Sequence, residues 1–247
     1  MDAGSAINLA LANWTFFAAV VVVRMMTCHE GIRSFRMRLS VEGLVLWAEG
    51  AAAAIGSWLL RGLFLVLTGH GSVALHAPGH GFWAALGWTA VGYLPVAVFE
   101  EGLFRGYVQD RLAAKYGIGL AIAAQAALFG PMHILAWPAA TNMLIRLAMV
   151  TVLALAMGTS VRDGRSLLWA VGFHQWWNVV DTLIMQSISP VQLITAEAES
   201  VYGALVNLGA AIVVLGCVRL RFLGGSAPVR STVTEREAAT ELLPAEE

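Results

Sequence analysis

The sequence predicts an all-α fold, a polytopic transmembrane helix bundle of about seven to eight spans. Of its 247 residues, 58% are hydrophobic and only 13% are charged, and the mean hydropathy is +0.71. A soluble domain usually has about a quarter charged residues, so a core of this size cannot hide so much apolar surface from water. The net charge of −1 provides no global basic field, which excludes nucleic acid as an expected partner.

The apolar residues gather in seven segments, most of which have the ~20 residues that a helix needs to cross a bilayer. The segments span residues 7–27, 43–69, 81–100, 118–136, 139–160, 166–186 and 201–219. An eighth or re-entrant segment is compatible with the same pattern. The start of the chain, Met1-Asp2-Ala3-Gly4, lacks the basic residues of a cleaved signal peptide, so the first segment is expected to remain as a span.

Two segments show signs of irregularity. The second is long and contains Glu49 and Arg61, which predicts a tilted or broken helix. The Gly117 and Gly119 pair predicts a break between two helices. The helix of the third segment is expected to continue past its apolar run to about Lys115, either protruding or lining a wet cavity.

Positive charges occur in alternate loops, and such residues favour the cytoplasm. They follow the first, third, fifth and seventh segments, at Arg33, Arg36, Arg38, Arg111, Lys115, Arg162, Arg165, Arg219, Arg221, Arg230 and Arg236. The loops at 70–80, 137–140 and 187–200 contain no Lys or Arg. The alternation predicts an N-terminus outside the cell and a cytoplasmic C-terminus.

Three short patterns place acids, imidazoles and a carboxamide in or beside apolar segments, where polar groups are costly and usually functional. They are Glu100-Glu101-x-x-x-Arg105, Phe129-x-x-x-His133 and His174-x-x-x-Asn178. On a helix, Glu101 and Arg105 share a face and can pair, whereas Glu100 points about 100° away. One acid is therefore neutralised locally and the other stays available for chemistry.

Counting along the predicted hairpin brings the first two patterns together. Glu100 lies sixteen residues before Tyr116 and His133 lies seventeen after it, so the two side chains fall at nearly the same level. Pro95 and Pro131 lie close to them, and proline inside a span kinks the helix and frees backbone groups, which can open a cavity. We therefore expect a site at this depth, with Phe129 as a packing aromatic.

His174 and Asn178 also lie four residues apart on one helix face. Both side chains present N–H donors, and their spacing lets them converge on one oxygen atom, as an oxyanion hole requires. Trp176 and Trp177 lie between them and are expected to pack or to anchor the helix at the interface.

These patterns resemble those of the CPBP family, the type II CAAX prenyl protease-like and Abi-domain proteins, which are described as intramembrane metalloproteases or glutamic endopeptidases. The stretch from Glu100 to Tyr107 matches the first family signature, and the other two pairs match the second and third in order and spacing. The resemblance covers about residues 81–185. It divides the chain into N-terminal transmembrane segments (1–80), a catalytic membrane core (81–223) and a flexible cytoplasmic tail (224–247).

The resemblance implies an intramembrane endopeptidase without a resident metal. Glu100, assisted by His133, would activate water as a general base, and His174 and Asn178 would stabilise the oxyanion. The supporting residues would be Glu101, Arg105 and Phe129. A carboxylate that titrates near ~4.3 is an adequate base only where its surroundings raise its pKa, as partial burial does.

Other chemistries remain open from the residues alone. Zinc is an alternative cofactor, since the patterns contain typical ligands, yet the chain has no His-Glu-x-x-His: Arg33 stands where the second histidine after His29 would be. A serine protease would need a nucleophile elbow and an aspartyl protease two membrane aspartates, of which only Asp181 lies in a segment. A transporter or silent scaffold would suit Arg61 and Arg146, although no internal repeat is visible.

The expected partners are the lipid bilayer and a membrane-anchored protein or peptide substrate. The segment count and the lack of an organelle signal predict a bacterial inner membrane. Processing of a C-terminal tail or a leader follows from the resemblance, with prenylated substrates the less expected class.

Overall fold

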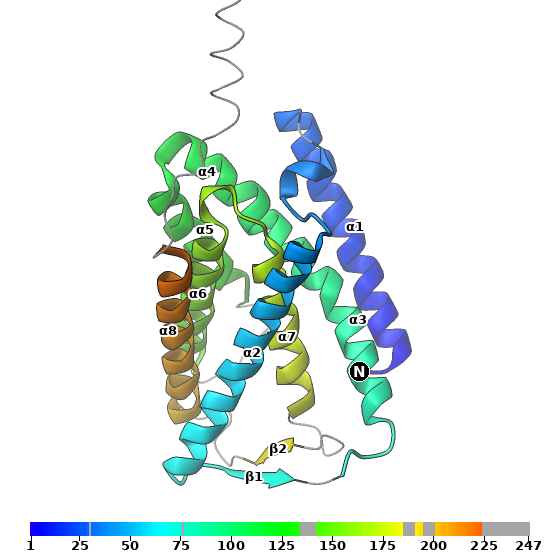
Figure 1. The fold of residues 1–247 in the computed structure, drawn as a ribbon, viewed down its shortest axis with the longest axis vertical. Coiled ribbons are helices and arrows are strands. Elements are labelled where there is room, and N and C mark those ends of the chain that lie inside the picture. The colour runs from blue at the N-terminus through cyan, green and yellow to red at the C-terminus, as the bar shows by residue number, and fades with distance from the viewer. Residues whose placement is uncertain (30, 76, 134–141, 185–190, 195–200, 224–247) are drawn as a thin grey trace, which may run out of the picture.

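The structure is a computed structural model that describes residues 1–29, 31–75, 77–133, 142–184, 191–194 and 201–223 (Figure 1). The major helices in this part of the chain are α1 (Ala3–Cys28), α2 (Val41–Leu67), α3 (Phe82–Glu101), α4 (Gln109–Tyr116), α5 (Ile118–Met132), α6 (Met143–Ser160), α7 (Leu168–Ile184) and α8 (Val201–Leu223). Shorter elements are η1 (Ile32–Phe35), the π-helix η2 (Gly102–Val108), η4 (Arg162–Gly164), β1 (Ser72–Leu75) and β2 (Val191–Ile194). The expected tail, 224–247, lies outside the described residues.

The predicted all-α bundle is confirmed, because the helices run up and down side by side (Figure 1). Among the described residues, five helical stretches are long and apolar enough to cross a membrane: Ala3–Thr27, Val41–Leu67, Phe82–Tyr116, Met143–Ser160 and Tyr202–Leu223. Two further helices are shorter, α5 with 15 residues and α7 with 17. The two histidine patterns lie on these short helices, with His133 directly after the last residue of α5.

The second predicted segment forms one unbroken helix, α2, of 27 residues. A hydrophobic stretch longer than the bilayer is thick is accommodated by tilting, and α2 crosses the bundle obliquely (Figure 1). Its two charged interior residues have different surroundings. Glu49 lies near one end, 3.5 Å from the exposed guanidinium of Arg221, whereas Arg61 is buried.

The third segment continues as helix through α3, η2 and α4 to Tyr116, as predicted. The sequence did not predict that the middle of this stretch is π-helical, with the Gln109 N–H bonded to the Phe104 carbonyl five residues earlier. Such wide turns are rare in proteins, and those that occur often lie at functional sites. Two glycines of this turn leave room for aromatic rings from the N-terminal part of the chain. A Cβ on Gly102 would lie 2.7 Å from the Phe17 ring, and a Cβ on Gly106 would lie 2.7 Å from the Phe35 ring.

Arginines from outside the π-helix hold its carbonyl groups. Arg24 of α1 donates from Nη1 to the Gly106 carbonyl, and Arg36 donates from Nη2 to the Arg105 carbonyl at 3.4 Å. Asp110 pairs with both guanidiniums, at 3.4 Å for Arg24 and 3.0 Å for Arg36. The N-terminal part of the chain therefore fixes the turn that presents the acid motif.

The predicted hairpin between α4 and α5 is confirmed. Gly117 joins the two helices with φ of +84°, a left-handed value that glycine adopts at little cost. The two helices pack against each other, which returns the chain from Tyr116 toward the acid motif.

A two-stranded ribbon, which the sequence did not predict, closes one end of the bundle (Figure 1). β1 pairs antiparallel with β2, with Ser72 opposite Ile194 and Leu75 opposite Val191. Each strand has only four residues, too few for a pattern of alternation to be informative. The ribbon joins the connections that follow α2 and α7.

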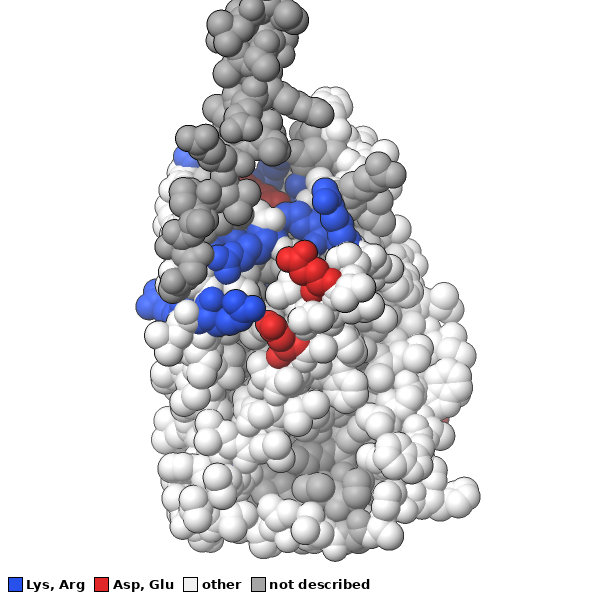
Figure 2. Space-filling model, in the orientation of Figure 1, with Lys and Arg blue, Asp and Glu red and all other residues white. Residues whose placement is uncertain are grey.

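Lys and Arg gather at the opposite end of the molecule, around α4, and the rest of the face drawn in Figure 2 is largely uncharged. This follows from the up-and-down topology, because the basic residues lie in alternate connections or in the helices beside them, at Arg36, Arg38, Arg111, Lys115, Arg162, Arg165, Arg219 and Arg221. The expected bare loop at 137–140, and much of that at 187–200, lie outside the described residues.

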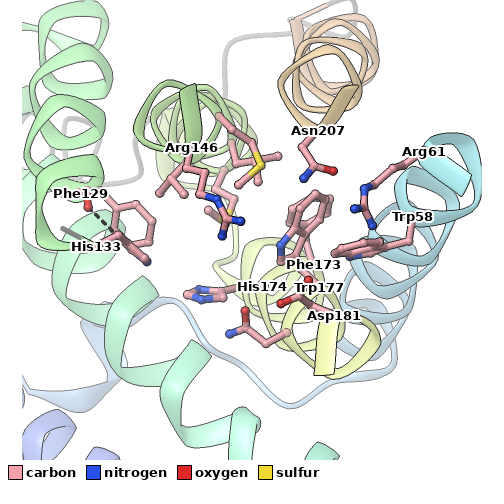
Figure 3. A pocket seen from close by; sticks show the side chains of 15 residues that line it. Trp58, Arg61, Phe129, His133, Arg146, Phe173, His174, Trp177, Asp181 and Asn207 are labelled. Atoms are coloured by element: carbon pink, nitrogen blue, oxygen red, sulfur yellow. Dashed lines mark hydrogen bonds between the residues drawn. The ribbon is translucent and has the colours of Figure 1, made fainter. Parts of the chain in front are cut away.

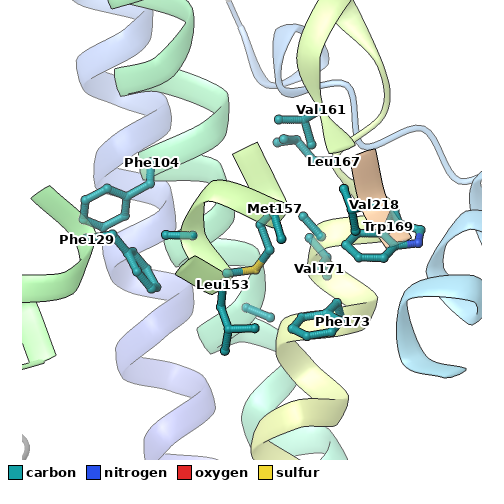
Figure 4. Close-up of a cluster of buried hydrophobic side chains, with 14 of the residues drawn as sticks. Phe104, Phe129, Leu153, Met157, Val161, Leu167, Trp169, Val171, Phe173 and Val218 are labelled. Carbon is teal, nitrogen blue, oxygen red and sulfur yellow. The ribbon is translucent and has the colours of Figure 1, made fainter. Parts of the chain in front are cut away.

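The core lies where η2, α5, α6, α7 and α8 meet, and its labelled side chains include Phe104, Leu153, Met157 and Phe173 (Figure 4). α2 and α7 form the most extensive helix pair. Their backbones approach at two glycines, where a Cβ on Gly172 would collide with the Trp47 backbone and one on Gly50 with the Trp169 carbonyl. Small residues allow such close approach between membrane helices.

We expect Gly172→Ala to destabilise the protein by about 1–3 kcal/mol, because the added methyl meets backbone that cannot move aside without separating α2 from α7. Thermal unfolding in detergent measures the effect. Gly56→Ala is the matched control: it lies on α2 with no atom within 4 Å of a new Cβ, and alanine favours helix there. Equal stability of the two variants would contradict the close approach.

Candidate active site

The acid motif separates into a paired and an unpaired carboxylate. Glu101 is completely buried, and its Oε1 accepts a hydrogen bond from Arg105 Nη1 at 3.1 Å, which confirms the predicted i, i+4 pair. Arg105 is also completely buried, donates to the Ala154 carbonyl at 3.4 Å and stacks 4.4 Å from the Phe129 ring centroid. Two partners on other helices therefore hold the guanidinium in place.

Glu100 has no such partner. Its Oε2 is buried and makes no hydrogen bond to any described residue, while the side chain as a whole is 24% exposed. The Nε2 atom of His174 lies 3.8 Å from Glu100 Oε2, beyond hydrogen-bonding distance. The Oε2 atom of Glu101 also makes no hydrogen bond to a described residue, but Glu101 is completely buried, so Glu100 is the carboxylate that another group can reach.

His174 links the two acids, which the sequence did not predict. Its Nδ1 lies 2.9 Å from Glu101 Oε1, so one imidazole nitrogen faces the paired acid and the other faces Glu100. An ionised carboxylate only accepts, so Nδ1–H donates to Glu101. In the neutral ring, Nε2 is then a hydrogen-bond acceptor. It donates a hydrogen bond only when the ring is an imidazolium.

Phe129 packs at the centre of the polar groups. Its ring centroid lies 4.8 Å from that of His133 and 6.2 Å from that of His174, in addition to the stacked Arg105. Its backbone carbonyl accepts from His133 Nδ1 at 3.1 Å. His133 also interacts electrostatically with Glu100, in line with the level expected from the hairpin count.

A cavity of about 350 Å³ opens beside this group, between α2, α5, α6, α7 and α8 (Figure 3). Its lining residues are Trp58, Arg61, Phe129, His133, Arg146, Met149, Val150, Leu153, Met157, Phe173, His174, Trp177, Asn178, Asp181 and Asn207. Of the predicted site residues, the cavity brings together Phe129, His133, His174 and Asn178. Glu100, Glu101 and Arg105 do not line it, although Glu100 Oε2 lies 3.8 Å from Nε2 of the lining residue His174.

The cavity also contains polar residues that the sequence assigned no catalytic part. From the sequence, Arg61 and Arg146 suit a transporter, Arg61 also indicates an irregular second helix, and Asp181 is a lone membrane aspartate. Asn207 had no assignment. The available signal was the presence of ionisable groups inside apolar segments, but no spacing rule connects residues on α2, α6, α7 and α8.

Two buried glutamines, also missed, explain how α6 is held beside the site. Gln125 donates to the Ala154 carbonyl at 2.9 Å and Gln109 to the Gly158 carbonyl at 3.1 Å. Within the described part of the chain, no group of three His, Cys, Asp or Glu side chains is arranged to hold a metal ion.

Comparison with known proteins identifies the domain. Residues 81–180 match the family model described as Type II CAAX prenyl endopeptidase Rce1-like, and this range contains all three patterns. No curated protein and no solved structure gives a significant match. Together with several long apolar helices, the match indicates an integral membrane protein. Residues 81–180 therefore form a domain that is similar to the Rce1-like, CAAX protease-like family.

Proposed function

We propose that this protein is an intramembrane endopeptidase that hydrolyses a peptide bond of a membrane-associated protein or peptide with water activated by Glu100 and His133. The observation that carries the proposal is the arrangement of the acids. Glu101 is completely buried and its Oε1 binds Arg105 and His174, while Glu100 is 24% exposed and has an oxygen without a hydrogen bond to the described residues. A general base needs such an oxygen.

In the proposed reaction, Glu100 takes a proton from water as the water oxygen attacks the substrate carbonyl. His133, which interacts electrostatically with Glu100, assists that transfer. The protonated Glu100 then acts as a general acid and donates this proton to the leaving amine as the peptide bond breaks. No covalent intermediate with the protein is required.

The developing oxyanion would be stabilised by His174 and Asn178, which line one wall of the cavity. Asn178 can donate from its amide. His174 can donate from Nε2 only as an imidazolium, since Nδ1–H is directed at Glu101. Glu101 and Arg105 would then act through His174, by fixing its ring and its charge.

We further propose a bacterial inner-membrane location with the N-terminus outside and the C-terminus in the cytoplasm. The gathering of Lys and Arg at the α4 end supports this orientation. The substrate class would be membrane-anchored proteins or peptides, cut in a C-terminal tail or a leader. No bound metal is required by this mechanism, and zinc dependence is its nearest rival.

The test begins with the termini of membrane proteins in cells that make the unmutated protein or its Glu100→Gln variant. A terminus that appears only with the unmutated protein identifies a substrate, which is then offered to purified protein with and without a chelator. We expect cleavage to continue in chelator. Loss of cleavage that added zinc restores would make the protein a metalloprotease, and the absence of any dependent terminus would favour a transporter or scaffold.

A further inference from the structure

The cavity has a second polar group, away from the acid motif. Arg61 of α2, Arg146 of α6, Asp181 of α7 and Asn207 of α8 line it together; in Figure 3 Arg61 lies beside Trp58, whereas Arg146 lies nearer His133 and His174. Three of the four lie outside residues 81–180, so the family match does not account for them. The proposed reaction assigns none of them a role.

Arg61 is the most informative of the four. Its exposed fraction is only 4%, and its Nε and Nη1 are buried without a hydrogen bond to any described residue. Its guanidinium stacks 4.5 Å from the Trp58 ring centroid, and Trp58 packs 5.2 Å from Trp177. A buried guanidinium with unused donors is costly in a membrane protein, and such groups mark ligand sites.

The charges of these four residues favour a monoanion. Asp181 interacts electrostatically with both arginines, and Arg146 also donates from Nε to Asn142 Oδ1 at 2.9 Å. Two guanidiniums and one carboxylate leave a single net positive charge. A carboxylate balances that charge, and guanidinium donors match its geometry; a phosphate would bring more negative charge than the group can neutralise.

The position of the group relates it to the proposed chemistry. His174, Asn178 and Asp181 follow the i, i+4, i+7 spacing of one helix face, and all three line the cavity. At 1.5 Å of rise per residue, Asp181 lies roughly 10 Å along α7 from His174. An extended peptide covers that length in about three residues, so one substrate can reach both places.

We propose that Arg61 and Arg146, balanced by Asp181, form a subsite for a carboxylate of the substrate, while Asn207 accepts a hydrogen bond from a neighbouring peptide N–H. The carboxylate belongs either to a free C-terminus or to an acidic side chain about three residues from the bond that is cut. This inference rests on the proposed peptide substrate, but its test measures binding and not cleavage.

The test compares three probes on the full-length protein: N-acetyl-leucyl-leucine, its C-terminal amide, and the amide of N-acetyl-leucyl-aspartate. Calorimetry or ligand-detected NMR gives the affinities. We expect at least one acid to bind about tenfold more tightly than the leucine amide, because charged hydrogen bonds are worth that much. Tighter binding of N-acetyl-leucyl-leucine would indicate that the subsite binds a terminal carboxylate. Tighter binding of the N-acetyl-leucyl-aspartate amide would indicate a side-chain carboxylate.

Arg61→Gln should abolish the preference for the acid and leave the amide affinity unchanged. Arg61→Lys keeps the charge and should retain part of the preference. Arg146→Gln gives a second, independent loss if Arg61→Gln does not fold. The matched control is Arg221→Gln, an arginine whose side chain is 61% exposed and lies outside this cavity, which should bind as the unmutated protein does.

Equal affinities for acid and amide, a preference that survives in folded Arg61→Gln and Arg146→Gln, or stronger competition by inorganic phosphate than by the acid would each overturn the subsite. The same holds if no acid binds. If the proposed endopeptidase function is wrong but the subsite is right, the protein will bind the acid selectively without any cleavage that depends on Glu100.

Discussion

Glu100→Gln is expected to reduce cleavage of a substrate by about 10²–10⁴-fold, the range that a positioned general base contributes. The amide has nearly the same shape as the carboxylate but cannot accept a proton from water. The Glu100 carboxylate lies 3.8 Å from His174 Nε2 and its Oε2 has no hydrogen bond to the described residues, so the fold loses little when its charge is removed. The measurements are the cleavage rate and the unfolding temperature of the purified protein.

Glu49→Gln is the matched control, because Glu49 also lies in an apolar helix but pairs with the exposed Arg221 away from the cavity. It should cut normally. His133→Ala should lose cleavage as Glu100→Gln does, since both belong to the proposed proton transfer. Full activity of a folded Glu100→Gln protein would rule out the glutamate mechanism.

The parts of this site that the sequence predicted are those set by local spacing. Helical geometry alone separates Glu101, which pairs with Arg105, from Glu100. Gly117 marks the hairpin that returns His133 toward the acids, because a left-handed residue must join the two helices. The all-α bundle followed from hydropathy, since a bilayer permits few other folds.

What the sequence could not predict depends on contacts between distant segments. His174 reaches Glu101 across 73 residues of sequence, and that distance is set by the packing of α3 against α7. The π-helical turn depends on Arg24 and Arg36, which bind its carbonyls from the N-terminal part of the chain. The sequence around His174, Arg24 or Arg36 contains no local pattern that predicts which distant group its side chain will bind.

The carboxylate subsite illustrates the same limit. Arg61 was visible as a charge in an apolar segment, which indicated a function without indicating which one. Only the shared cavity relates it to His174 and Asn178. Long-range packing therefore decides whether an intramembrane arginine serves transport, structure or substrate binding.

Glu101→Gln is expected to destabilise the protein by about 3–5 kcal/mol, because it leaves the Arg105 charge buried without its carboxylate. Both side chains are completely buried, so water cannot compensate, and the Ala154 carbonyl and Phe129 ring are weaker partners. Unfolding of the purified protein in detergent measures the loss. Cleavage should fall as well, since His174 Nδ1 loses its charged acceptor.

A double variant separates the two effects. Glu101→Leu with Arg105→Met removes both buried charges, and replacing a buried ion pair by apolar residues of similar volume is often neutral or stabilising. We expect the double variant to be more stable than Glu101→Gln yet still unable to cut, because nothing then orients His174. If Glu101→Gln instead folds as well as the unmutated protein and is inactive, Glu101 takes part in the reaction itself and the division of labour between the two acids must be reversed.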